Sequence, residues 1–214
     1  MKDLLTPIQR RFLEYLNADK TFRRYFYLTG GTALSAFHLF HRYSDDLDFF
    51  THQSDLDIVP GLMKHAENKL NIKAKQSRKS PHFLRYDIEN GLKIYFVADV
   101  SFRHGSPEII SDFLVDSVKN IAVNKVCAIL GRLDSKDYVD LYLILKKYKY
   151  DIFELLELGA KKDAGLELFI WASVIADVQQ LSILPKIIVP ITLKEITDFY
   201  LELRDSILDK IKPV

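Results

Sequence analysis

The chain has 214 residues, of which 48% are hydrophobic and 28% charged, and its formal net charge is +1. This composition predicts a globular rather than a disordered protein, gives no general attraction to nucleic acid, and with only one cysteine allows no internal disulfide. No window approaches the roughly 18 apolar residues of a membrane helix and the first residues lack a signal-peptide pattern, so we expect a cytoplasmic protein without a membrane partner.

The first elements in chain order are predicted to be a helix, a strand and a second helix. Residues 6–9, Thr-Pro-Ile-Gln, form a capping-box pattern that opens a helix reaching about residue 16. The aromatic segment 24–28 indicates a strand that ends at a glycine pair. A helix is expected to follow over residues 32–41.

Alternation and turn residues predict further strands. Residues 46–49 alternate acidic and apolar, which indicates a strand with both carboxylates on one face and the apolar side chains on the other. A helix is expected at 60–70, and the turn Glu89-Asn90-Gly91 lies between two long strands of a hairpin. The sheet should therefore be mixed, with at least four strands.

From about residue 116 the pattern becomes helical. Apolar spacing and a second capping-box pattern, at residues 192–195, predict helices over 118–130, 137–148, 163–181 and 192–211. The predicted fold class is α+β, a mixed β-sheet core with flanking helices followed by a C-terminal helical bundle. We place the two domains at residues 1–110 and 111–214.

The turn Gly30-Gly31-Thr32 between strand and helix is the first candidate for chemistry. Glycines let a backbone approach a ligand closely, and the amides at the start of a helix favour phosphate oxygens. An ordinary turn has the same residues, so this signal alone is weak.

The acidic strand adds to that signal. Asp46 and Asp48 on one face, with Asp45 nearby, repel each other unless cations or hydrogen bonds compensate them, and Mg²⁺ prefers such oxygen ligands together with phosphates. Asp99 lies in an apolar run where an unpaired charge is costly, so it is a candidate third metal ligand. The alternative for Asp99 is a residue at a strand end that caps a turn.

Two segments together resemble a known family. The stretch YLTGGTALSAFHLFHRYSDDLDFF at 27–50, followed by NKVCAILGRLDSKDYVDLYLIL at 124–145, is similar to the AbiEii/AbiGii toxin family, a branch of the DNA polymerase β-type nucleotidyltransferase superfamily. The resemblance implies that the sheet forms a nucleotidyltransferase core. The C-terminal helices after residue 145 carry no motif of the family that we recognise.

The resemblance assigns roles residue by residue. It implies that Gly30, Gly31 and Thr32 hold the nucleotide phosphates, that Asp46 and Asp48 hold Mg²⁺, and that Lys125 and Asp137 are the downstream catalytic pair, with Asp140 three positions on. Many superfamily members have Gly-Ser where this chain has Gly-Gly, whereas Gly-Gly-Thr-Ala-Leu is found in the toxin branch. The third metal-binding acid is not uniform in that branch, which leaves Asp99 the least secure of these residues.

The chemistry of the residues in the second segment can also be interpreted without the resemblance. A lysine can supply a positive charge to a triphosphate, and a nearby aspartate can orient that ammonium or accept a proton from an attacking hydroxyl. Alternatively, Asp137 lies in the first turn of a helix that Asp134 can cap, where a negative charge is favourable in any case. Lys125 can equally be a solvated helix residue.

Other polar residues are candidates for phosphate contacts. Arg42 and Ser44 lie between the expected helix and the acidic strand, where a fork of donors and a hydroxyl can bind phosphate or simply form a surface turn. Residues 64–85 contain seven cations, Lys64, Lys69, Lys73, Lys75, Arg78, Lys79 and Arg85. This basic stretch can bind nucleic acid or serve as a solubilising helix flank and loop.

The sequence thus predicts a Mg²⁺-dependent nucleotidyltransferase that transfers a nucleotide from a nucleoside triphosphate to an acceptor hydroxyl. The resemblance implies a toxin of a toxin–antitoxin or phage-defence pair, with a separate antitoxin protein as partner and the acceptor end of tRNA as a possible substrate. The alternatives are transfer to a protein or small molecule, and a non-catalytic nucleotide-binding protein that engages a partner.

Overall fold

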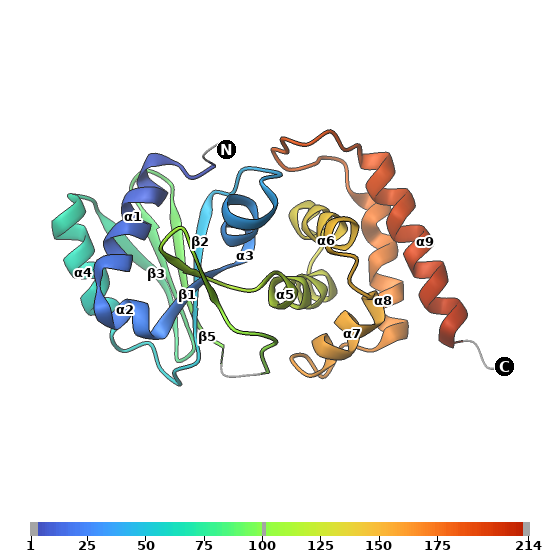
Figure 1. The fold of residues 1–214 in the computed structure, drawn as a ribbon, viewed down its shortest axis with the longest axis horizontal. Coiled ribbons are helices and arrows are strands. Elements are labelled where there is room, and N and C mark those ends of the chain that lie inside the picture. Colours follow the sequence, from blue (N-terminus) through green and yellow to red (C-terminus); the bar gives the residue numbers. More distant parts are fainter. Residues whose placement is uncertain (1–3, 100–101, 212–214) are drawn as a thin grey trace. The chain divides into compact units, whose positions relative to one another are not determined.

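The computed structural model describes residues 4–99 and 102–211, and the chain divides into two compact units. Unit 1 comprises Met1–Phe102 with Ser106–Ser117, and unit 2 comprises Arg103–Gly105 with Val118–Val214. Unit 1 combines a sheet with helices and unit 2 is helical, which confirms the predicted fold class (Figure 1). That the chain forms a core domain over residues 1–110 and a C-terminal helical domain over residues 111–214 stays a prediction.

Unit 1 contains a seven-stranded sheet in the order β3-β4-β5-β2-β1-β7-β6. Its strands are β1 (Phe26–Thr29), β2 (Asp46–Thr51), β3 (Ala74–Ser80), β4 (Phe83–Ile88), β5 (Lys93–Ala98), β6 (Glu108–Ile110) and β7 (Phe113–Val115). β2 runs antiparallel to β1 and parallel to β5, while β4 and β5 form the expected antiparallel hairpin. The predicted mixed sheet is therefore confirmed.

The helices of unit 1 cover mainly one face of this sheet. They are α1 (Pro7–Ala18), α2 (Lys20–Tyr25), α3 (Gly30–Ala33) and α4 (Val59–Leu70), with the π-helix η1 (Leu34–Leu39) continuing α3. Figure 1 shows α1, α2 and α4 along the same side of the strands. The capping box of α1 is confirmed, because Thr6 N donates to Gln9 Oε1 at 2.8 Å and Gln9 N donates to Thr6 Oγ1 at 3.3 Å.

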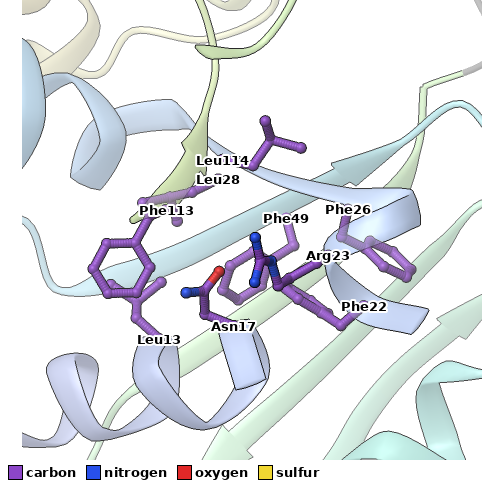
Figure 2. A pocket seen from close by; sticks show the side chains of 9 residues that line it. All are labelled: Leu13, Asn17, Phe22, Arg23, Phe26, Leu28, Phe49, Phe113 and Leu114. Carbon is purple, nitrogen blue, oxygen red and sulfur yellow. The ribbon is translucent and has the colours of Figure 1, made fainter. Parts of the chain in front are cut away.

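Aromatic side chains fill the layer between these helices and the sheet. The ring of Phe49 stacks on the ring of Phe96 of β5, with 5.5 Å between the ring centroids. It meets the ring of Phe22 of α2 edge-on, with 5.0 Å between the centroids. Figure 2 shows a small pocket on this helix-covered side, lined by Leu13, Asn17, Phe22, Arg23, Phe26, Leu28, Phe49, Phe113 and Leu114. Because Phe49 points away from the side of its strand that carries the carboxylates, this pocket belongs to the core and not to the candidate site.

Two local expectations in unit 1 differ from the structure. The helix expected at 32–41 begins at Gly30 and becomes a π-helix that ends at Leu39. The capping residue Phe40 has a φ of +55°, and its N donates to Ser35 O. The basic segment 74–80 is a strand and not a loop. Its almost wholly polar sequence shows no apolar alternation, and pairing with β4 alone makes it a strand.

Unit 2 consists of helices around a buried hydrophobic core. They are α5 (Val118–Gly131), α6 (Ser135–Tyr148), α7 (Ile152–Ala160), α8 (Leu168–Ile175), the 3₁₀-helix η2 (Ala176–Gln180) and α9 (Leu193–Ile211). Trp171 is fully buried and donates through Nε1 to Val126 O at 3.0 Å. The expected capping box of α9 forms between Thr192 and Glu195.

The long helix expected over 163–181 is interrupted. Asp163 Oδ1 accepts from Gly165 N at 2.9 Å, which makes a turn, and α8 starts only at Leu168 and tightens into η2 at its end. The helix α7 was missed, although Asp151 caps it by accepting from Phe153 N at 2.9 Å. Within residues 4–99 and 102–211, the structure has no helix with the length and apolar character needed to cross a bilayer.

Candidate active site

The glycine turn lies directly against the acidic strand. β1 ends at Thr29, which pairs with Asp48 of β2, and the next residue, Gly30, has a φ of +70°. A methyl group at Gly30 would lie 2.4 Å from Asp48 Oδ2. At Gly31 it would lie 2.5 Å from Arg42 Nη2 and 3.0 Å from Ser44 Oγ. The structure therefore brings the predicted turn together with one predicted metal ligand and both predicted phosphate-binding side chains.

Gly30→Ala is expected to displace the Asp48 carboxylate, because the added methyl group overlaps it. Gly91 is a matched control, since its φ is +89° and a methyl group there meets no atom within 4 Å. We expect both changes to lower the free energy of unfolding by about 1–2 kcal/mol through the left-handed backbone, but only Gly30→Ala to abolish activity. Urea unfolding and nucleotide-transfer assays would check this, and equal activity of the two variants would contradict it.

The two carboxylates of β2 share one face of the sheet, as predicted. Asp46 and Asp48 are half-buried, whereas Leu47 and Phe49 between and after them are buried in the core. Thr32 Oγ1 donates to Asp46 O at 2.5 Å, which ties the first turn of the helix to the acidic strand. Thr32 itself is buried, so its hydroxyl contributes to the position of the turn.

Arg42 and Ser44 are held in place by backbone contacts. Arg42 is 2% exposed, and its Nη1 donates to Tyr43 O at 2.9 Å. Gln9 of the α1 capping box also donates through Nε2 to Ser44 O at 2.8 Å. Sequence reasoning did not find this second role of Gln9, because 35 residues separate the partners and no pattern signals the contact.

Asp99 is not brought to the other acids, so we remove it from the expected ligand set. Asp48 pairs with Tyr95 of β5, and Asp99 follows four residues later, about 13 Å further along the strand direction. There its N donates to Thr51 O at 2.8 Å and its O contacts His52 Nδ1 at 2.8 Å. Its position at the strand end matches the alternative considered for it.

Asp46 and Asp48 fit a Mg²⁺ site of the kind completed by substrate. Across the part of the chain that the structure describes, no group of three or more His, Cys, Asp or Glu residues is arranged to hold a metal ion. Mg²⁺ is commonly bound by one or two carboxylates, with substrate phosphates and waters supplying the other oxygens. Asp46 and Asp48 are the two carboxylates that the protein would contribute to such a site.

Unit 2 has a charged cluster of its own in its core. Lys125 of α5 donates to Asp137 Oδ1 at 2.8 Å and lies 2.7 Å from Asp140 Oδ2, both on α6. The side chains of these residues are at most 8% exposed. Lys125 is therefore not the solvated helix residue considered above. Asp134 caps α6 as expected, accepting from Lys136 N at 3.0 Å, so Asp137 does lie in a first turn.

Asp137 is held by two cations. Besides Lys125, Arg132 donates through Nε to its Oδ2 at 2.8 Å, a contact that sequence reasoning missed. Burial alone would raise the pKa of Asp137, but the charge of Lys125 and the hydrogen bonds from Arg132 and Lys125 outweigh it and keep the pKa below the ordinary value of an aspartate. A carboxylate with a lowered pKa and both oxygens engaged is a poor proton acceptor. This favours the orienting role over the general-base role.

The lowered pKa of Asp137 predicts an acid-sensitive core in unit 2. Because the folded pKa lies below the ordinary value of an aspartate, the stabilisation is present at pH above that ordinary value and is lost as the pH falls through the folded pKa. Urea unfolding between pH 5 and pH 3 should show a fall in stability that is shallower in Asp137→Asn. An equal slope in both proteins would contradict this.

Comparisons with known proteins identify the family to which this chain is similar. Residues 11–209 match the family described as nucleotidyl transferase AbiEii toxin, type IV toxin–antitoxin system. An uncharacterized protein of Aquifex aeolicus is 31% identical over 148 residues, which cover 66% of this chain and 68% of that protein.

Two solved structures share the fold. JHP933 from Helicobacter pylori is 18% identical with a TM-score of 0.59, covering 95% of this chain and 90% of its own. MenT4, a nucleotidyltransferase toxin from Mycobacterium tuberculosis, is 14% identical with a TM-score of 0.53, covering 96% and 83%. With the family match extending over nearly the whole sequence, this chain belongs to the AbiEii nucleotidyltransferase toxin family of type IV toxin–antitoxin systems.

Proposed function

We propose that this toxin transfers a nucleotide from a nucleoside triphosphate to the hydroxyl of an RNA, with Mg²⁺ bound by Asp46 and Asp48. The observation that carries the proposal is the contact between the Gly30-Gly31 turn and Asp48, with Arg42 and Ser44 against the same turn. A triphosphate needs close backbone approach, positive donors and a metal-binding pair in one place, and these residues supply all three.

In the proposed reaction the acceptor hydroxyl gives its proton to water, its oxygen attacks the α-phosphorus, the bond from that phosphorus to the bridging α–β oxygen breaks, and pyrophosphate leaves. Mg²⁺, when bound, neutralises charge on the phosphate oxygens. The main-chain amides near Gly31 and the hydroxyl of Ser44 orient the phosphates, and the buried Arg42 supplies fixed positive charge. Most of the catalysis is thus positioning and electrostatic stabilisation.

Lys125, Asp137 and Asp140 enter the proposal through the family resemblance. We assign Lys125 the contact with the leaving phosphates and its two carboxylate neighbours the orientation of its ammonium. The distances of 2.8 Å and 2.7 Å support that orienting role, because they fix the Nζ position in a nearly dry environment.

The acceptor and partners are proposed as follows. The family resemblance suggests the acceptor end of tRNA, and membership in a toxin–antitoxin family implies a separate antitoxin protein. To test the acceptor, the protein is incubated with Mg²⁺, each labelled nucleoside triphosphate, and total RNA. We expect label in the RNA fraction.

Other results would redirect the proposal. Label in the protein fraction or in a small molecule would replace the RNA acceptor with that class. Nucleotide binding in calorimetry with no transfer to any acceptor would contradict the enzymatic proposal in favour of a nucleotide-binding interaction protein. The double variant Asp46→Asn with Asp48→Asn is the control for background labelling.

A further inference from the structure

The face of the sheet that carries Asp46 and Asp48 continues across three more strands. Residues directly opposite one another in neighbouring strands point to the same side of a sheet. The pairing register defines one row through Asp46 and a second through Asp48. The first contains Asp46, Lys93, Asp87 and Lys75, and the second contains Asp48, Tyr95, Arg85 and Arg78.

This face is open to solvent within its strands. On β4 and β5 the side chains that point toward the helices, such as Leu84 and Phe96, are buried, whereas those on the carboxylate side are half-buried or exposed. Every residue of the edge strand β3 except Ala74 is exposed. Inter-strand spacings of about 4.8 Å make the surface from β2 to β3 about 14 Å wide.

The side chains on this face are of the types that proteins use to bind single-stranded nucleic acid, namely aromatic and basic ones. Tyr95 lies one strand from Asp48, with the Phe83 ring 6.0 Å from its own and the Arg85 guanidinium 5.9 Å from its centroid. Unpaired bases stack on aromatic rings of open sheets, and a four-stranded sheet can hold two or three of them. On β3, β4 and β5 the two rows contain four cations and one carboxylate, Asp87. Asp87 is paired with Arg85 at 2.7 Å.

We propose that the surface formed by Lys75, Arg78, Arg85, Lys93 and Tyr95, here named the acceptor face, binds the single-stranded end of the RNA that receives the nucleotide. Tyr95 stacks on a base next to the acceptor hydroxyl, and the cations of β4 and β3 contact successive phosphates further from Asp48. The inference rests on the proposed function for the identity of the RNA as acceptor, while the binding surface can be tested by itself.

A competing explanation concerns the edge strand. Lysines on an exposed edge strand prevent it from pairing with the strands of other chains. They can do so from either face of the sheet. The acceptor face instead requires the cations of one side only. Lys79 pairs with Leu84 and therefore points to the opposite side from its neighbour Arg78, which gives a matched control within the same strand.

The test measures binding without catalysis. Fluorescence anisotropy follows a short fluorescein-labelled single-stranded RNA, and its duplex, in EDTA and without nucleotide. Lys75→Ala with Arg78→Ala should reduce the slope of log affinity against log salt by about 1.4, because each lost phosphate contact accounts for about 0.7. The control, Lys69→Ala with Lys79→Ala, removes the same charge from outside the face and should keep the wild-type slope.

Tyr95 is tested in the same assay. Tyr95→Ala should weaken binding about 5- to 150-fold through loss of stacking, whereas Tyr95→Phe should retain it. Unchanged affinity in Tyr95→Ala and an unchanged slope in the β3 double variant would overturn the inference, as would equal binding of duplex RNA. If Tyr95 is required for binding but the wild type labels no RNA with Mg²⁺ and nucleotide, the proposed reaction fails, and the surface stands as a binding site for single-stranded RNA.

Discussion

Asp46→Asn is expected to reduce nucleotide transfer by about 10³-fold or more while leaving the fold intact. The substitution removes one of the two carboxylates proposed to hold Mg²⁺, and electrostatic stabilisation of the phosphates depends on both. Stability should change little or rise slightly, since Asp46 and Asp48 share one face of β2 and repel each other without a cation. Transfer rates and urea unfolding curves measure the two effects separately.

Asp45→Asn is the matched control for this variant. It makes the same chemical change at the adjacent residue, which is exposed and precedes β2. We expect near-normal transfer from it. Comparable activity losses in the two variants would show that general surface charge, and not the carboxylate pair, governs the reaction.

Lys125→Ala is expected to destabilise unit 2 by about 3–5 kcal/mol. The change leaves Asp137 and Asp140 buried beside each other without the ammonium that both contact, and breaking a buried ion pair by removing one partner has a cost of this size. Arg132, which is exposed, still contacts Asp137 in this variant. We therefore expect the loss of the ammonium to affect Asp140 more than Asp137. Urea or thermal unfolding would measure the loss.

Lys119→Ala on the same helix provides the comparison. Lys119 pairs with Glu154 in a more exposed position, and such pairs contribute up to about 1 kcal/mol. If both lysine variants lose the same small amount of stability, the buried cluster does not stabilise the core of unit 2.

Elements with short-range signals were predicted well from the sequence. The capping boxes at Thr6 and Thr192 involve partners three residues away, and the hairpin at Gly91 is specified by its own turn. The alternation of β2 also sufficed to put Asp46 and Asp48 on one face. In each case the interactions that decide the structure lie within a few residues.

Elements that depend on distant partners were predicted poorly. β3 has no apolar periodicity, and its hydrogen bonds to β4 alone define it, so the sequence of 74–80 contained no strand signal. The distance from Asp99 to the other acids depends on the register of β2 against β5, which composition does not encode. Gln9 and Arg132 reach site residues through side-chain contacts that no spacing rule describes.

The site itself was predicted more completely than its surroundings. The turn at Gly30 and Gly31, with Arg42, Ser44 and Asp48, meets in unit 1 because β1 and β2 are adjacent antiparallel strands. The contact between Lys125 and Asp137 was anticipated as one that orients the ammonium. The equally short contact between Lys125 and Asp140 was not anticipated. Which residues approach one another in unit 1 was thus readable from the sequence, whereas the number of contacts each group makes required coordinates.

The fate of the phosphate groups tests the central claim most directly. The protein is incubated with Mg²⁺, RNA and a nucleoside triphosphate labelled either at the α- or at the γ-phosphate. Nucleotide transfer predicts that α-label enters the RNA and that γ-label is released as pyrophosphate, with neither event in Asp46→Asn. Entry of γ-label into the RNA would show phosphoryl transfer instead and would contradict the account.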